Sequence, residues 1–475
     1  MTSTSDDPEA LFRRAAKHAV AYRRAVGGKL HRPEMTYGEA LHHWEAPTPE
    51  AGTPAEAVLE ELVERAGPGL HAMTGPRFFG WVIGASHPAG VAADWLVSAW
   101  GQNVGNHAGA PAGSAAETVS ARWLVDILGL PAGSSVGFVT GATMANLVGL
   151  AAGRSEVLRR VGWDVEAQGL FGAPPIRVLV GEDVHVSALS ALQFLGLGHD
   201  RVTKVAADEE GRMRPDALAA AMEGHGGPCI VMIQAGQINT GAFDPFERIV
   251  PIAKAHGAWV HVDGAFGLWA NACPSRAALC AGVALADSWA TDGHKWLQTP
   301  YDCGFAIVRD ADAHRRAMAF GASYLPPVAE GERDPTHYVP ELSRRARGFT
   351  TWTMLRHFGR SGIAEMVERH CRLARLIADR VAEEPGIEVI NRVELNQVVL
   401  RFGGAATEEI GNDLTQRTIS RLQKDGVCFA GGSKWRGRWL MRISVSGYPT
   451  TETDAIRSAE AIRAAWRAVR GRNDA

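Results

Sequence analysis

The segment CIVMIQAGQINTGAFDPFERIVPIAKAHGAWVHVD, residues 229–263, has the pattern of a strand, a helix and a second strand. The runs 229–235 and 258–263 are short and apolar, whereas 245–257 spaces its apolar residues as an amphipathic helix does. Short apolar strands joined by a helix are typical of a parallel sheet that is covered on both faces. The segment therefore predicts an α/β fold.

The same alternation extends on both sides of this segment, from about residue 120 to residue 291. Helix patterns separate four further strand patterns, at 136–140, 176–181, 202–206 and 287–291. Because ligands of such folds bind at the carboxyl ends of the strands, we look for functional residues just after each strand.

The pattern changes after about residue 350. Long helix patterns now surround isolated strand-like runs, which predicts a smaller α+β unit. We therefore expect a helical N-terminal segment over 1–80, a large domain over 81–355 and a small C-terminal domain over 356–475.

Composition excludes several classes of protein. The 475 residues are 46% apolar and 21% charged with a formal net charge of −3, so no basic excess points to nucleic acid. The polar start MTSTSDDPEA is no signal peptide, and the uncharged stretch 95–116 is too rich in Gly, Asn and Pro for a membrane helix. Six cysteines without CxxC spacing indicate reduced thiols and no zinc site. We expect a cytoplasmic protein with no nucleic-acid or membrane partner and no metal.

Lys295 follows the strand pattern 287–291 and is one of seven lysines beside 42 arginines. A solvated lysine is replaceable by arginine, whereas an amine that must lose its proton and attack a carbonyl is not. The apolar neighbours Trp289, Trp296 and Leu297 favour such an amine, although a surface lysine is the common alternative.

Two other groups lie directly after strand patterns. Gly141, Ala142 and Thr143 precede a helix, where backbone N–H groups and the helix dipole can hold a phosphate. Asp263 ends the strand at 258–263 and can pair with a protonated ring nitrogen, although a turn or helix-capping Asp is the ordinary alternative. A phosphate cradle, a pyridinium partner and an imine-forming amine together suit pyridoxal 5′-phosphate (PLP).

The chain resembles the PLP-dependent amino acid decarboxylases that include the aromatic-L-amino-acid and glutamate decarboxylases (group II). The resemblance covers about residues 75–450, and its motifs are TGATMANLVGLAAGR, EDVHVSALSAL, AGQINTGAFDPF, HVDGAFG and ADSWATDGHKWLQTPYDCG. It implies the type I, aspartate aminotransferase-like fold, with a mostly parallel seven-stranded sheet. It also implies a homodimer whose active sites lie at the subunit interface.

By this resemblance, Lys295 would hold the cofactor as a Schiff base and Asp263 would bond its pyridine nitrogen. Ala265 and His185 would lie on the two faces of the ring. We count Lys295, Asp263 and His185 among the catalytic residues. A satisfied, partly buried histidine is the alternative for His185.

The resemblance places the cofactor phosphate at Ala142, Thr143 and His294. Asp292 belongs to the same group but stands where relatives often carry Asn, and a carboxylate would repel the phosphate unless it turned away. Asn239, in QINTGAFD, matches a stretch that approaches the phenolic oxygen of the cofactor.

The reaction that the resemblance implies is decarboxylation to the amine and CO₂. In these relatives a loop tyrosine protonates the substrate carbon, and Tyr324 fits that place, with Tyr338 as the rival. Relatives that release an aldehyde carry Phe at this position, so Tyr324 favours simple decarboxylation. An aminotransferase or carbon–carbon lyase of the same fold remains an alternative.

The substrate pocket is expected, again by resemblance, in the stretch that holds Trp81, His87, Asn103 and His107. This stretch has no arginine or lysine between Arg77 and Arg122, which favours an aromatic or other uncharged substrate over an acidic one. Because another segment can supply a cation, an aspartate, glutamate or cysteine sulfinate decarboxylase stays an alternative. A last alternative is a metal hydrolase built on the pairs Asp183/His185 and His261/Asp263.

Overall fold

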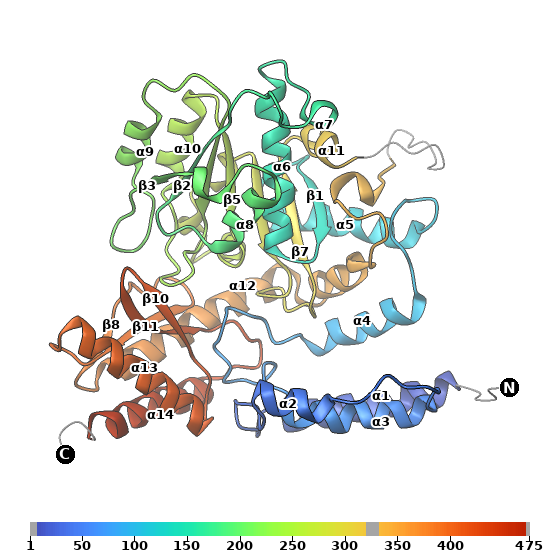
Figure 1. Ribbon diagram of the computed structural model, residues 1–475, viewed down its shortest axis with the longest axis vertical. Helices are drawn as coiled ribbons and strands as arrows, with labels where there is room; N and C mark the ends of the chain where they lie inside the picture. Colours follow the sequence, from blue (N-terminus) through green and yellow to red (C-terminus); the bar gives the residue numbers. More distant parts are fainter. Residues whose placement is uncertain (1–6, 320–331, 472–475) are drawn as a thin grey trace.

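The computed structural model describes residues 7–319 and 332–471 (Figure 1). Within them, one seven-stranded sheet has the order β1-β7-β6-β5-β4-β2-β3, and only β7 runs antiparallel to its neighbours. The strands are β1 Ser135–Val139, β2 Arg177–Gly181, β3 Thr203–Val205, β4 Cys229–Gln234, β5 Trp259–Asp263, β6 Ser288–Asp292 and β7 Gly304–Val308. The predicted type I fold is confirmed.

Both faces of this sheet are covered, as the apolar runs predict. Along β4, Cys229, Val231 and Ile233 pack into one core cluster, whereas Ile230 and Met232 pack into another on the opposite face. One cluster lies under α5 Pro111–Ile127, α9 Pro215–Met222, α10 Phe246–Ala255 and α12 Arg347–Ala382. The other lies under α6 Ala142–Arg159, α8 Val186–Phe194 and α11 Ala311–Met318.

The C-terminal part contains an antiparallel four-stranded sheet of order β10-β11-β9-β8. Its elements are β8 Ile387–Val389, β9 Gln397–Phe402, α13 Glu408–Asp425, β10 Gly431–Trp435, β11 Arg438–Ser444 and α14 Glu452–Arg470. The domain boundary predicted at residues 355/356 falls inside α12, near Gly359, whose φ of 59° interrupts the helix. The three-part division stays a prediction.

The N-terminal segment forms α1 Pro8–Ala25, α2 Tyr37–Trp44 and α3 Ala55–Ala66, which extend along the lower edge of the molecule, beyond α4 Pro88–Trp100 (Figure 1). None of these first three helices buries a residue. Instead, apolar side chains such as Phe12 and Leu41 are more than half exposed. The remaining short helices are α7 Val165–Gln168, η1 Gly67–Gly69, η2 His199–Arg201, η3 Gly267–Ala272, η4 Ala277–Cys280, η5 Val283–Leu285 and η6 Pro335–Tyr338.

No helix in the described parts of the chain has the length and apolar character that a membrane crossing needs.

Candidate active site

The sheet order brings together the residues that follow β1, β5 and β6. The turn after β1 leads into α6 through Gly141, which lies against the first residue of β7, Gly304. A Cβ on Gly304 would stand 2.5 Å from the Cα of Gly141, so only glycine lets the two segments approach this closely. The start of α6 is therefore held beside the loop that follows β6.

Lys295 lies in that loop and points to Asp292. Its Nζ is 2.9 Å from Oδ2 of Asp292, and its side chain is only 14% exposed. The other carboxylate oxygen, Oδ1, accepts a hydrogen bond of 2.6 Å from the N–H of Ala142 and lies 3.5 Å from Nε2 of His294. The structure thus groups Lys295, His294, Asp292 and Ala142, and Thr143 is exposed at the same helix start.

This group fits a phosphate in its chemistry. The N-cap residue of α6, Gly141, has no side chain to cap the helix, and the N–H of Ala142 donates to an anionic oxygen, that of Asp292. Burial lowers the pKa of His294, whose ring stacks on Tyr301 with 4.3 Å between centroids. A helix N-terminus beside an ammonium group is a suitable site for an anion.

Asp263 ends β5 next to this group. Its Oδ1 accepts a hydrogen bond of 3.2 Å from the N–H of Ala265, and its Oδ2 accepts one of 3.1 Å from Asn146. The carboxylate is 7% exposed, and each oxygen has a further lone pair for a ring N–H.

His185 caps the N-terminus of α8, where its Nδ1 accepts from the N–H of Ser187 and lies 2.7 Å from the Ser187 hydroxyl. Burial lowers its pKa, which favours the neutral ring. The charge of Asp263 opposes this shift, whereas the charges of Lys295 and Arg442 add to it. His185 therefore shares its surroundings with all three residues.

Arg442 has no counterpart among the predicted site residues. It lies on β11 of the small sheet, and burial lowers its pKa to about 10. Within residues 7–319 and 332–471, no hydrogen bond or ion pair engages its guanidinium group. Its signal in the sequence is a lone arginine in the apolar run LMRISV, and only the fold brings its charge near enough to lower the pKa of His185.

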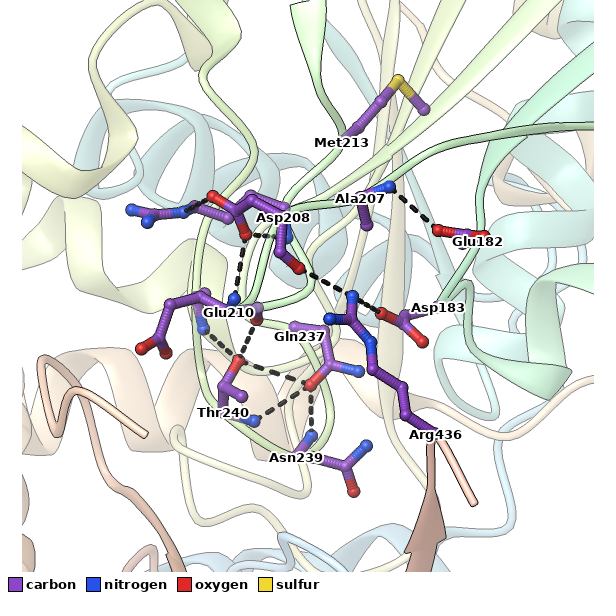
Figure 2. A network of polar contacts seen from close by, with 12 residues as sticks. Glu182, Asp183, Ala207, Asp208, Glu210, Met213, Gln237, Asn239, Thr240 and Arg436 are labelled. Carbon is purple, nitrogen blue, oxygen red and sulfur yellow. Dashed lines mark hydrogen bonds and ion pairs between the residues drawn. The ribbon is translucent and has the colours of Figure 1, made fainter. Parts of the chain in front are cut away.

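Asn239 lies in a loop that the small domain contacts. Its side-chain oxygen accepts a hydrogen bond of 2.8 Å from Ser433 of β10, and its N–H donates to the side chain of Gln237. Figure 2 shows this loop together with Arg436, whose guanidinium lies 2.8 Å from Oδ2 of Asp183 and 2.6 Å from the carbonyl oxygen of Asp208. The turn between β10 and β11 thus contacts the segments that carry Asn239 and His185.

The four predicted pocket residues contact other partners within the subunit. Trp81 packs against Phe429 and is 53% exposed. His87 caps α4, and burial beside His357 lowers its pKa to about 4.

The other two predicted pocket residues hold neighbouring segments. Asn103 accepts from the N–H of Arg344, and Nδ1 of His107 lies 2.6 Å from Asp334, whose hydrogen bond raises the pKa of that ring. Their role in a pocket stays a prediction.

The two candidate proton donors differ in position. Tyr324 lies outside the described residues. The ring of Tyr338 lies 4.4 Å from the guanidinium of Arg333 and 5.2 Å from the ring of His314, a packing position beside β1.

The metal-hydrolase alternative has no ligand set in the described parts of the chain, where no three His, Cys, Asp or Glu side chains group as a metal site. Asp183 pairs with Arg436, and His261 bonds to Asn146 and Ser288.

Comparison with known proteins agrees with this geometry. The family model of the pyridoxal-dependent decarboxylase conserved domain matches residues 38–403. Tryptophan decarboxylase 1 of Oryza sativa subsp. japonica is 25% identical over 98% of this chain and 93% of its own. Cysteine sulfinic acid decarboxylase of Mus musculus is 30% identical over 50% of each chain. A crystal structure of Oryza sativa TDC with PLP and tryptamine has a TM-score of 0.90 at 24% identity, covering 98% of this chain and 99% of that one.

Proposed function

Because the chain belongs to the pyridoxal-dependent decarboxylase family, and so is a PLP-dependent amino acid carboxy-lyase, we propose that its substrate is an L-amino acid with an aromatic or other uncharged side chain. The carrying observation is Arg442, a partly buried cation whose charge lowers the pKa of His185 and whose guanidinium has no partner among the described residues. An unpaired, partly buried guanidinium is a strong receptor for one carboxylate. Every amino acid substrate has one carboxylate next to its amine, and Arg442 would hold that group.

The described residues around His185 do not supply a second free cation that could bind a distal carboxylate of the substrate. Lys295 and Arg442 are the two cations whose charges lower the pKa of His185, and Lys295 is the amine that would carry the cofactor. Arg344, a buried arginine that contacts the predicted pocket residue Asn103, pairs with Glu117 at 2.6 Å. The cations near His185 in the described parts of the chain therefore suit a substrate with one negative charge.

When bound, PLP accepts the electron pair released by the bond between Cα and the carboxylate. We assign Lys295 to the covalent link with the cofactor aldehyde and Asp263 to the pyridine nitrogen. His185 and Ala265 would lie against the ring faces, and Asn239 near its phenolic oxygen. Tyr324 would donate the proton that Cα needs after CO₂ leaves.

The phosphate of the cofactor would take the start of α6, held by the backbone of Ala142 and the hydroxyl of Thr143. His294 would add a hydrogen bond, and the N-terminal end of the helix dipole would favour the negative charge. Asp292 lies in the same place and opposes the phosphate, so its carboxylate has to turn from the N–H of Ala142.

The N-terminal helices support a homodimer. Phe12 and Leu41 are 62% and 52% exposed. Trp95 and Leu96 of α4 are also apolar, and they are 44% and 49% exposed. Apolar surface of this kind is suited to cover a second copy of the chain. Sedimentation equilibrium should give a dimer that Phe12→Asp weakens, whereas Phe171→Asp, at a residue that is 98% exposed, should leave it intact.

A cytoplasmic location is part of the same proposal. All six cysteines are free and buried, as thiols of a reducing compartment are. Fractionation of cells that express the protein would test it.

The substrate proposal is tested by measuring amine and CO₂ with each of the twenty amino acids and dihydroxyphenylalanine. Aromatic or uncharged substrates should give the highest kcat/KM. If aspartate, glutamate or cysteine sulfinate were the best substrate, the uncharged class would be wrong. Oxo-acid formation without CO₂ would instead indicate an aminotransferase.

The role of Arg442 has its own test. Arg442→Gln should raise KM at least tenfold, the size expected for one charge-assisted bond, while the product amine, which lacks the carboxylate, should inhibit as in the wild type. Arg438→Gln, an exposed residue of the same strand, is the matched control. If the amine lost affinity as well, Arg442 would serve the structure of the site and not the carboxylate.

A further inference from the structure

A buried chain of hydrogen bonds ends at the carboxylate of Asp263. Trp259 Nε1 lies 2.9 Å from Ser288 Oγ, which lies 2.7 Å from Nδ1 of His261. Nε2 of His261 lies 2.8 Å from Oδ1 of Asn146, whose Nδ2 lies 3.1 Å from Oδ2 of Asp263. All five side chains are at most 7% exposed.

Only one direction of donation satisfies every member of this chain. The carboxylate of Asp263 accepts, so the amide nitrogen of Asn146 donates to it and the amide oxygen faces His261. His261 must then donate from Nε2, which leaves Nδ1 to accept from the hydroxyl of Ser288. The indole N–H of Trp259 can only donate, and it supplies the hydrogen bond that the Ser288 oxygen accepts.

His261 holds a single proton in this chain. Complete burial lowers its pKa to about 4, so the ring is neutral near pH 7. A neutral imidazole has one donor and one acceptor, and both are used here. The ring of His261 therefore carries its proton on Nε2, and the last hydrogen bond of the chain is donated by Asn146 to Asp263.

The sequence of α6 makes room for this chain. A Cβ on Gly149 would lie 2.7 Å from Cε1 of His261, and one on Gly153 would lie 2.7 Å from Cδ1 of Trp259. Asn146, Gly149 and Gly153 follow helical spacing, so one face of α6 carries both the donor to Asp263 and the two gaps. The strand β5 supplies Trp259, His261 and Asp263 at every second position, all toward this face.

We propose that Asn146 and His261 are positioning residues that hold Asp263 as an oriented anion and so keep the pyridine nitrogen of the cofactor protonated. A donor to a carboxylate favours its charged form, and a buried chain of donors strengthens the last bond. An anionic Asp263 favours the ring N–H⁺ that it faces. The inference rests on the proposed contact between Asp263 and the pyridine nitrogen.

The decisive measurement is the ¹⁵N chemical shift of PLP labelled at the ring nitrogen, bound to wild type and variants. Asn146→Leu and His261→Leu should lower the protonated fraction of that nitrogen and reduce kcat about tenfold, as expected for losing one hydrogen bond to a charged group. His261→Gln, whose amide can donate and accept, should restore part of both. His314→Leu removes another fully buried histidine, so it should reduce stability without changing the ring nitrogen.

Asp263→Asn tests the contact between Asp263 and the pyridine nitrogen separately from the positioning of Asp263 by Asn146 and His261. If this variant left the nitrogen protonated, the contact proposed for Asp263 would be wrong. If Asp263→Asn lowered the protonated fraction but Asn146→Leu and His261→Leu did not, the contact would stand and the positioning inference would fail.

A measurement on the wild-type protein alone covers the case in which the leucine variants do not fold. The ¹⁵N spectrum of protein with labelled histidine should show His261 with its proton on Nε2 near pH 7. A proton on Nδ1 would reverse the chain and overturn the inference.

Discussion

The Nζ of Lys295 lies 2.9 Å from Oδ2 of Asp292, while Oδ1 of the same carboxylate accepts from the N–H of Ala142. One buried anion thus connects the amine proposed to bind the cofactor with the helix start proposed to bind its phosphate. Asp292 is 2% exposed, so water screens its charge poorly. Asp292 and a phosphate would compete for the same donor and the same cation.

Replacing Asp292 by Asn should therefore strengthen PLP binding. Asparagine keeps the shape and removes the negative charge, and a gain of about tenfold corresponds to removing one partly screened repulsion. Titration of the cofactor-free enzyme with PLP, followed by protein fluorescence, measures the Kd. Asp200→Asn, at a residue with a 93% exposed side chain, is the control for the change in net charge. An unchanged or weaker Kd in Asp292→Asn would show that the carboxylate does not oppose the phosphate.

Lys295→Arg should fold normally and lose decarboxylation, because a guanidinium group stays charged near pH 7 and cannot attack the cofactor aldehyde. Borohydride reduction followed by peptide mapping should place the cofactor on Lys295 in the wild type and on no residue in the variant. Lys204→Arg, on an exposed position of β3, should retain full activity and labelling. A cofactor adduct on a different lysine would contradict the assignment of the site.

Particular residues show how far the sequence predicts this molecule. The strands β2 and β4 are predictable because they are buried, mostly apolar runs, and β5 and β6 because short runs with buried apolar residues alternate with helix patterns. Lys295 and Asp263 stand out because each follows such a strand. The strand β7 was not separated from the motif before it, since Gly304 begins only nine residues after Lys295.

The sequence pattern does not reveal residues whose role depends on contacts with segments far away in the chain. The charge of Arg442 acts on His185 only because the fold brings the two near each other, although they lie 257 positions apart in the chain. Asn146 and His261 are ordinary helix and strand residues until the fold brings them to 2.8 Å. The resemblance places His107 in a substrate pocket, whereas the fold pairs its ring with Asp334. No pattern in the sequence indicates this pairing.

The contact of Arg436 with Asp183 predicts an effect on substrate binding. Arg436, in the turn between β10 and β11, contacts Asp183 of the large domain (Figure 2). Ser433 of β10 bonds to Asn239, and β11 carries Arg442. Arg436→Ala should loosen the turn and raise KM by up to about fivefold, which corresponds to roughly 1 kcal/mol for a partly exposed ion pair, with kcat nearly unchanged. Steady-state kinetics measures this, with Arg438→Ala, at the exposed first residue of β11, as the control. Equal kinetic constants in all three proteins would show that the pair does not position Arg442.

Buried histidines predict a loss of stability in mild acid. Burial lowers the pKa of His31 and His261 to about 4 and that of His314 to about 3, below the ordinary value of 6.5. The unfolded chain therefore binds protons first as the pH falls, so this stability is complete above pH 6.5 and declines toward pH 4. Each group contributes a slope of about 1.4 kcal/mol per pH unit within that window.

Urea unfolding between pH 7.5 and pH 4.5 measures this slope. His314→Gln should make the dependence shallower by about one proton, whereas His199→Gln, at an exposed residue, should leave it unchanged. A free energy of unfolding that is flat across the window would contradict the burial of neutral histidines.

Tyr324 is the residue proposed to protonate the substrate carbon after CO₂ has left. Tyr324→Phe removes one hydroxyl proton donor, so CO₂ release should continue while protonation of that carbon slows. Oxygen can then react, so that one amino acid, one O₂ and one water yield aldehyde, CO₂, ammonia and hydrogen peroxide. The ratio of amine to CO₂ should fall below one. Tyr338→Phe, at a ring that packs between Arg333 and His314, should keep the ratio at one.

Mixing Lys295→Arg with Tyr324→Phe subunits should restore part of the amine yield if the tyrosine acts across a dimer, since one site then combines an intact Lys295 with an intact Tyr324. Equal amounts of amine and CO₂ at the normal rate from Tyr324→Phe would assign the proton to another group, with His185 as the next residue to change.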